Sequence, residues 1–503
     1  MPPDLGTAED RNKDENEDKR NNETLKNAIN KKLLYIKQIV TVEPLIALYQ
    51  MAQFLSKPAL DNLEFEKSCR VNLRYNDTIC EAILTGHHQN FSSQNGQIQV
   101  IISDMHSWQQ PVQSFMPLVL VLFLGSFSDR HKWRKPFLLL PVLGELFGIL
   151  GCMLCAVFMR SWPLEAQGVS QKVIPSLFGG QIMLVMASTA YIADVSSVKM
   201  RTLRLGIVQI VLSVCSPLVY LFNGTLFVRI GYLGVLSMSA AMYAASLAYG
   251  SVWIREPRVK ERFNKDCVLA DVFDPTHAID TFKLVFKESG NNKAYFRTVI
   301  AMIFVYRGAF EGETNVLYLY TQNVFQWTPV EYSYLVTVNG FVHLVGNALG
   351  VPIFTKILHL SDLMILFITI LSKIARNIVY GLARTVPIFY AGIFVGIITG
   401  VYKVVKKSIA TKIVSENDIG KAQSLIGICE ALAPAVSVPV YNKLIYINML
   451  TTYPATFFFF SILFYATCCV LVIWMYCQEK KKQKNSRSVQ NNVGGKVIET
   501  VHM

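Results

Sequence analysis

Long apolar segments recur along the whole chain, each long enough for a helix that crosses a lipid bilayer. Their cores lie near residues 39–55, 107–127, 136–159, 173–194, 204–225, 231–254, 298–319, 332–354, 362–382, 387–407, 422–444 and 453–476. A spanning helix uses about 20 mostly apolar residues, and only helices and closed barrels can satisfy their backbone groups in lipid. The pattern predicts an all-α, polytopic membrane protein with about twelve transmembrane helices.

The composition fits lipid as the solvent for most of the chain. Of the 503 residues, 52% are hydrophobic and only 17% are charged, whereas a soluble domain carries about 25% charged residues. The net charge of +13 comes from Lys and Arg residues dispersed between the apolar segments. It therefore indicates positively charged loops rather than a nucleic-acid-binding domain, and we expect the lipid bilayer as the main partner.

The apolar segments fall into two groups of six, separated by a polar, basic stretch. We expect a disordered cytoplasmic tail at 1–35, a first half at 36–254 with a long outer loop at 56–105, a cytoplasmic connection at 255–297, a second half at 298–477 and a basic cytoplasmic tail at 478–503. A signal peptide is not expected, because the first residues lack an apolar core.

Charge and sequons predict that both ends of the chain are cytoplasmic. The connections that would then lie inside hold most of the loop Lys and Arg residues, as the positive-inside rule requires. The opposite face would carry the glycosylation sequons at Asn76, Asn90 and, more weakly, Asn223. Cys69 and Cys80 lie near the first two sequons and are candidates for a disulfide.

The connection between the second and third apolar segments has the composition of a gate. It contains Gly125, Asp129, Arg130 and Arg134. The glycine permits close helix approach, and the charged side chains can pair with neighbouring helices in one conformation. An ordinary positively charged loop is the alternative. The segment resembles the loop signature of major facilitator carriers, although it lacks their usual glycine within the basic part and is one residue longer.

A second segment makes the resemblance more specific. Tyr191-Ile-Ala-Asp194 closes the fourth apolar segment, and Arg201-Thr-Leu-Arg204 opens the fifth. With Ala410-Thr-Lys-Ile-Val and Gly420-Lys-Ala-Gln-Ser424, these motifs resemble the proton-coupled folate transporter family (solute carrier family forty-six), insect-type members in particular. The resemblance covers nearly all of residues 36–477. It adds Asp194, Arg201 and Arg204 to the candidate gating residues.

This resemblance implies a major facilitator fold, with two six-helix halves around a cavity that opens to alternate sides. It also implies an organic anion as substrate, such as a folate or pterin, a conjugated steroid, a muropeptide or a cyclic dinucleotide, and protons as the coupling ion. Gln209 stands where the folate-carrying branch has an acid, and that branch's seventh-span histidine has no counterpart near Tyr306 and Arg307. These departures argue against folate. Lys407 keeps the charge of the family's tenth-span arginine.

Ionisable residues within apolar segments are costly in lipid and are therefore candidate functional sites. They are Glu43, Glu145, Arg307, Glu311, Glu313, His343, Lys373, Arg376 and Glu430. Arg307 and Glu311, four residues apart, could contact substrate or form a structural ion pair. Lys373 and Arg376 could meet an anion together or extend to lipid headgroups. His343 is a candidate for the coupled proton or a packed histidine, and Glu145 is expected to make structural contacts.

We therefore predict a secondary transporter of a small organic anion, located in the plasma membrane or, as second choice, the lysosomal membrane. The alternative is a receptor or scaffold on a carrier fold, without net transport. The sequence contains no metalloprotease, nucleophile-elbow or P-loop motif. We expect neither enzymatic activity nor a cofactor or metal.

Overall fold

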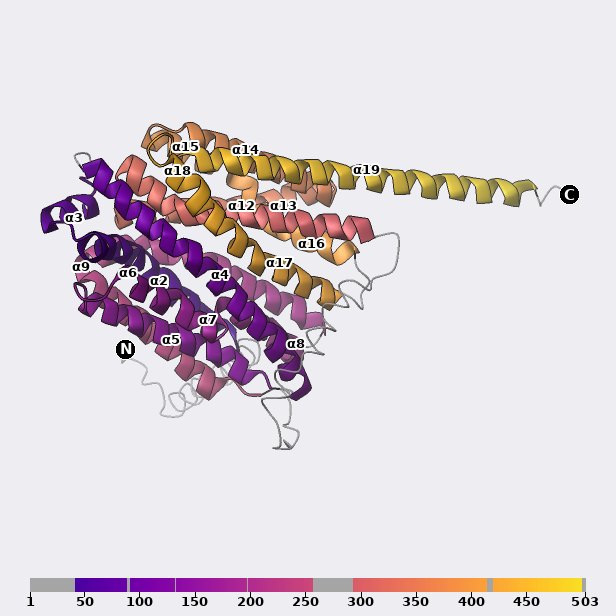
Figure 1. The fold of residues 1–503 in the computed structure, drawn as a ribbon. Coiled ribbons are helices and arrows are strands. Elements are labelled where there is room, and N and C mark those ends of the chain that lie inside the picture. Colours follow the sequence, from indigo (N-terminus) through magenta and orange to yellow (C-terminus); the bar gives the residue numbers. More distant parts are fainter. Residues whose placement is uncertain are drawn as a thin grey trace, which may run out of the picture.

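The computed structural model describes residues 41–87, 91–131, 133–196, 198–256, 293–413 and 419–499, and these residues form helices without a β-strand. The long helices run side by side, and α3 lies at the opposite end of the bundle from the free end of α19 (Figure 1). Residues up to 256, in indigo to magenta, gather on one side, and residues from 293 onward, in salmon to yellow, gather on the other.

The helices of the first half carry the following bounds: α2 (Glu43–Lys67), η1 (Ser68–Asn72), α3 (Asp77–Leu84), α4 (Ser92–His131), α5 (Lys135–Val157), α6 (Leu164–Gly168), η3 (Val169–Val173), α7 (Ile174–Leu177), α8 (Gly180–Val195) and α9 (Val198–Trp253). Those of the second half are α12 (Lys293–Phe325), α13 (Pro329–Pro352), η5 (Ile353–Ile357), α14 (Asp362–Leu382), α15 (Val386–Val395), η6 (Ile397–Val401), α16 (Tyr402–Ile413), α17 (Ile419–Pro439), η8 (Val440–Tyr446), α18 (Ile447–Met449) and α19 (Thr456–Glu499).

Within the described residues, 6 helices are long and apolar enough to cross a membrane, and a further pair, α15 with the segment from η6 into α16, forms a broken span bent by 44°. Other long rods are interrupted by polar side chains, as α2 is by Lys57, Asp61 and Glu64. The α9 element comprises two rods, because Gly231 takes a backbone conformation (φ 66°) that suits glycine. The six apolar spans, the broken span and the second rod of α9 make up most of the bundle. Together with the more polar rods α2, α4, α12 and α17 they give about twelve rods, in line with the predicted all-α polytopic fold.

The stretch expected to be a long outer loop at 56–105 is largely helical. The α2 helix continues to Lys67, and α4 already begins at Ser92. Asp61 and Glu64, two of the polar residues that suggested a loop, are buried within α2 and do not end the helix. The remaining connection is closed by a disulfide between Cys69 and Cys80.

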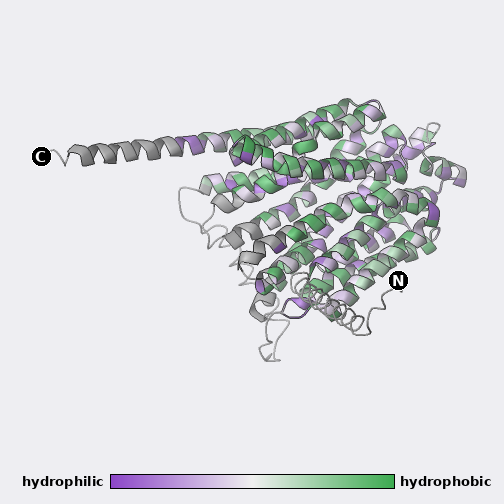
Figure 2. Cartoon of the chain, turned by 180° about the vertical axis from the view of Figure 1, so that it is seen from behind, coloured by the Kyte–Doolittle hydropathy of each residue, from purple (hydrophilic) through white to green (hydrophobic). Residues whose placement is uncertain are grey.

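Large hydrophobic side chains are exposed along the outside of the rods, including Phe222, Val228, Leu463 and Val470, each more than 60% exposed. Figure 2 shows hydrophobic residues prevailing along the lengths of the described helices. A soluble protein does not expose apolar surface on this scale. The outer faces are therefore suited to lipid.

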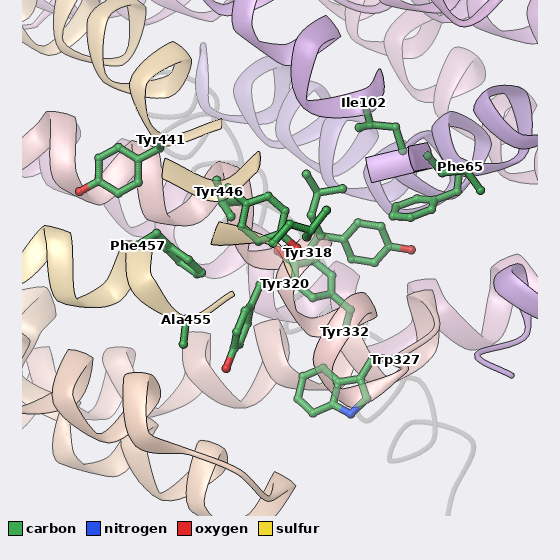
Figure 3. Packing of buried hydrophobic residues seen from close by; sticks show 14 of the residues in the cluster. Phe65, Ile102, Tyr318, Tyr320, Trp327, Tyr332, Tyr441, Tyr446, Ala455 and Phe457 are labelled. Carbon is green, nitrogen blue, oxygen red and sulfur yellow. The ribbon is translucent and has the colours of Figure 1, made fainter. Parts of the chain in front are cut away.

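An aromatic cluster joins the two halves at the end of the bundle that carries α3. Phe65 of α2 and Ile102 of α4 meet Tyr318, Tyr332 and Tyr446 of the second half (Figure 3). The ring centroids of Phe65 and Tyr318 are 5.8 Å apart, and those of Tyr318 and Tyr332 are 4.9 Å apart. We call this cluster the aromatic seal.

Polar contacts reinforce the aromatic seal. The fully buried Gln99 of α4 donates from Nε2 to Gln322 Oε1 over 2.7 Å, and its Oε1 accepts from the Tyr446 hydroxyl over 2.7 Å. Gln322 and Tyr446 belong to the second half. The bundle is therefore closed between its halves at the α3 end.

Candidate functional site

A cavity of about 1130 Å³ lies between the two halves, beyond the aromatic seal. Its walls come from α2, α4, α5, η3, α7, α8 and α9 of the first half and from α12, α16 and α17 of the second. A smaller hollow of about 40 Å³ lies at its sealed end and shares with it Lys57, Gln110, Gln171, Lys172, Thr314 and Asn315. The cavity is large enough for a drug-sized organic molecule, since ligand pockets are typically about 300–1,000 Å³.

Among the described residues, cations outnumber acids on the cavity wall. The cations are Lys57, Lys172, Arg307 and Lys406, and the acids are Glu145, Glu311 and Glu430. Arg307 and Glu311 form an ion pair of 2.7 Å within α12, and Lys406 of α16 pairs with Glu430 of α17. These contacts bring together Arg307, Glu311 and Glu430, three residues that the sequence singled out.

The half-buried Lys172 differs from the other cavity cations. Lys57 pairs with Asp61, with Nζ and Oδ2 3.4 Å apart. Glu145, the acid of α5, accepts instead from the hydroxyl of Tyr49 over 2.9 Å. In the part of the chain that the structure describes, no carboxylate lies within ion-pair distance of Lys172. A cation in such a place favours an anion in the cavity.

The hollow at the sealed end contains a second polar cluster. His106 Nε2 of α4 and Glu64 Oε2 of α2 are 2.9 Å apart. Asp61, one helical turn before Glu64, lines the same hollow together with Lys57 and Lys172. Carboxylates and an imidazole are thus gathered where the cavity meets the aromatic seal.

Other predicted residues lie in the second half but outside the cavity wall. Lys373 Nζ of α14 is 2.6 Å from Glu313 Oε2 of α12, and both side chains are almost completely buried. Arg376 contacts the His343 ring, with Nη1 and Nε2 3.3 Å apart, and lies over the ring of Tyr380. Lys373 is thus paired within the half, whereas Arg376 has no carboxylate within ion-pair distance among the described residues. Because Lys373, Arg376 and His343 do not line the cavity, their position does not favour them as substrate contacts.

The predicted gating residues gather at the other end of the first half. Arg134 donates from Nε to Asp194 Oδ2 over 2.8 Å. Arg204 lies 3.6 Å from Glu43 and donates to Ser196 over 3.0 Å. Glu43 therefore belongs to this network, not to the cavity. The surroundings of Gly125 and the side chains of Asp129, Arg130, Arg201, Gln209 and Lys407 lie outside the described part of the chain.

The three predicted glycosylation sites differ in accessibility. Asn76 is exposed just before α3, whereas Asn90 lies outside the described residues. Asn223 is fully buried in α9, and its Nδ2, the atom that a glycan would occupy, donates to Phe54 O over 2.7 Å. The structure therefore argues against glycosylation at Asn223, which lies in a helix and not in a short outer loop.

Sequence reasoning missed Lys57, Lys172, Lys406 and the Glu64–His106 pair. The available signal was helical spacing, because Lys57, Asp61 and Glu64 follow one another at intervals of four and three residues and share one face of a helix. Lys172 lies on η3, a π-helical turn, a distortion that frequently occurs at functional sites. Within the described ranges, no group of three metal-ligating side chains is positioned to hold an ion.

Comparison with known proteins agrees with this arrangement. Residues 101–375, more than half of the chain, match the Major Facilitator Superfamily. The probable peptidoglycan muropeptide transporter SLC46 of Drosophila melanogaster is 23% identical over 428 residues, covering 83% of this chain and 81% of the relative. The lysosomal proton-coupled steroid conjugate and bile acid symporter SLC46A3 of Gallus gallus is 24% identical over 452 residues, covering 88% and 95%.

Among solved structures, the human organic anion transporter MFSD10 is similar with a TM-score of 0.60 and 18% identity, covering 87% of this chain and 99% of that one. This likeness concerns the fold alone. The two sequence relatives confirm the resemblance to solute carrier family forty-six that the motifs around Asp194 and Arg204 predicted. The chain is a multi-pass membrane protein and belongs to the Major Facilitator Superfamily.

Proposed function

We propose that this protein is a proton-coupled secondary transporter of a small organic anion that works by alternating access. The observation that carries the proposal is Lys172 on the cavity wall, which has no carboxylate within ion-pair distance among the described residues. A cation away from bulk water is costly unless an anion meets it. A carboxylate, sulfate or phosphate on the substrate would supply that anion.

The named functions of the relatives support this chemistry. The Drosophila relative is named as a probable muropeptide transporter, and the Gallus relative is named as a proton-coupled symporter of steroid conjugates and bile acids. Substrates of these classes bear acidic groups. A cavity of about 1130 Å³ has room for molecules of this size. The lysosomal relative also supports a lysosomal membrane as a location beside the plasma membrane.

The two ends of the bundle support alternating access. Contacts between the halves, through Gln99 and the aromatic seal, lie at the α3 end. The cavity extends from there toward the end at which Arg134 and Asp194 pair. With both chain ends in the cytoplasm, this is an inward-facing state, and transport requires that the aromatic seal open while the opposite end closes.

The proposal is tested with the purified full chain in phosphatidylcholine liposomes. We expect concentrative uptake of tritiated estrone sulfate or muramyl dipeptide under an inward proton gradient, and none of neutral mannitol. Replacing Lys172 with Gln should raise KM about tenfold, equivalent to about 1.4 kcal/mol of binding. The control Lys356→Gln changes an exposed cation outside the cavity. Binding of either anion without concentrative uptake would contradict transport and favour the receptor alternative.

A further inference from the structure

We infer that Glu64 and His106 form the proton-binding site that couples protons to the anion in this chain. The inference deepens the proposed function and rests on it for the coupling, although not for the binding of the proton. The two residues belong to different helices, α2 and α4, and meet at the sealed end of the cavity.

The geometry offers the pair a position for an additional proton on the imidazole. Glu64 is 2% exposed, and its Oε2 lies 2.9 Å from His106 Nε2. An imidazole that donates from Nε2 to a carboxylate is neutral until Nδ1 also takes a proton. His106 Nδ1 is buried and has no hydrogen-bond partner among the described residues. Nδ1 is therefore the atom at which the pair can gain a positive charge.

A proton can reach this atom through the small hollow. His106 and Glu64 both line it, and its volume of about 40 Å³ exceeds the ~10–15 Å³ that a water molecule needs. The hollow shares Lys57, Gln110, Gln171 and Lys172 with the large cavity. Water in the hollow would therefore connect the imidazole to the space in which substrate binds.

The surrounding charges explain how a proton would favour an anion. Lys57 and Asp61 face the pair from α2, Lys172 from η3, Tyr318 from α12 and Tyr332 from α13; Glu145 of α5 acts on Lys172, and Tyr220 of α9 acts on Lys57. With His106 neutral, the two lysines of the hollow balance Asp61 and Glu64. A proton on His106 adds one positive charge to the groups that line the hollow.

This charge lies beside Lys172, where the anion is proposed to bind. Proton and anion then increase each other's affinity by the same factor, as linkage requires, and this is the condition for symport. His343, the histidine predicted from the sequence as a proton site, does not lie near the proposed anion position. It contacts Arg376 and does not line the cavity. Histidine ordinarily changes charge between about pH 5 and 8, the range over which such coupling operates.

The first test compares uptake of tritiated estrone sulfate by liposomes at pH 5.5 and pH 7.5. We expect the wild-type KM to fall about tenfold at the lower pH, within the usual range of coupling factors, and that of His106→Gln to change less than about twofold. Glu64→Gln, a second variant in case the first does not fold, should likewise reduce the fall in KM at the lower pH, because the carboxylate that holds the imidazole is gone.

The second test needs no substrate. Protein labelled with ¹³C-histidine is titrated in detergent and followed by infrared spectroscopy. His106→Gln should lose one imidazole transition that the wild type and the control His87→Gln, an exposed histidine, both retain. The assignment of His106 would be overturned if His106→Gln kept every imidazole transition of the wild type. It would also be overturned if the KM of His106→Gln depended on pH as the wild-type KM does. Failure of the wild type to carry estrone sulfate or muramyl dipeptide would contradict the proposed function instead, and the titration would still decide the proton site.

Discussion

Lys373 of α14 and Glu313 of α12 form a buried ion pair, with Nζ and Oε2 2.6 Å apart. Asn377 donates to the other oxygen of Glu313 over 2.5 Å, and Lys373 lies 5.3 Å from the ring centroid of Tyr465. The pair therefore connects three rods of the second half. Its charges are neutralised inside the protein and are not available to a substrate.

The Lys373–Glu313 pair should matter for stability more than for substrate affinity. Removing one partner of a buried pair costs about 3–5 kcal/mol, because the other charge is left unpaired. We expect Lys373→Gln to lower the thermal midpoint of the detergent-solubilised protein, and Glu313→Gln combined with Lys373→Gln to recover part of the loss. A fully stable Lys373→Gln protein with a tenfold higher KM would instead make Lys373 a substrate residue.

The Arg134–Asp194 pair should control conformational exchange. Asp194→Asn removes a contact that one conformation makes and does not alter the cavity, so we expect the maximal uptake rate to fall several-fold while KM changes less than about twofold. The control is Asp77→Asn, which also loses ion pairs, with Arg70 and Arg160, but at the opposite end. A large change in KM at an unchanged maximal rate would contradict a gating role.

The orientation can be tested at Asn76. If the α3 end is extracytoplasmic, Asn76→Gln should reduce the glycosidase-sensitive shift in electrophoretic mobility, whereas Asn223→Gln should leave it unchanged, because Asn223 is buried. Tags at both chain ends should be accessible to antibody only after the cells are permeabilised. Labelling of an N-terminal tag on intact cells would reverse the proposed orientation.

The disulfide between Cys69 and Cys80 closes a loop with a sequence separation of 11 residues. The chain-entropy estimate for a loop of this size is about 3 kcal/mol. We expect the double change Cys69→Ser with Cys80→Ser to lower the thermal midpoint, whereas Cys477→Ser, at an exposed free cysteine, should not. Equal midpoints for the double variant and the wild type under oxidising conditions would show that the bond contributes nothing.

The sequence predicted the continuously apolar rods better than those with several polar side chains along their length. The segment predicted at 362–382 coincides with α14, and the segment at 136–159 nearly coincides with α5, because both are apolar over the width of a membrane. The first segment was ended too early, at residue 55, because Lys57, Asp61 and Glu64 look like loop residues until the second half covers them.

The candidate site was predicted only in part, for a related reason. Spacing along one helix revealed Arg307 with Glu311, since both belong to α12. It could not reveal that Lys373 has its acid on α12, or that Glu64 meets a histidine on α4. Contacts between helices that are far apart in the sequence depend on how the helices pack. The pattern of residues in a single sequence does not predict that packing.

The charge balance around the small hollow also affects how tightly the flow of protons is coupled to the flow of the organic anion. Among the groups that line the hollow, Lys57 and Lys172 offset Asp61 and Glu64 when His106 is neutral, so the hollow itself holds no excess charge in the empty protein. A carrier with a proton but no anion would hold an unbalanced charge, and its conformational change would be slow. On the proposed mechanism we therefore expect the hollow to suppress proton leak, so that protons cross chiefly together with substrate and little of the gradient is dissipated without transport.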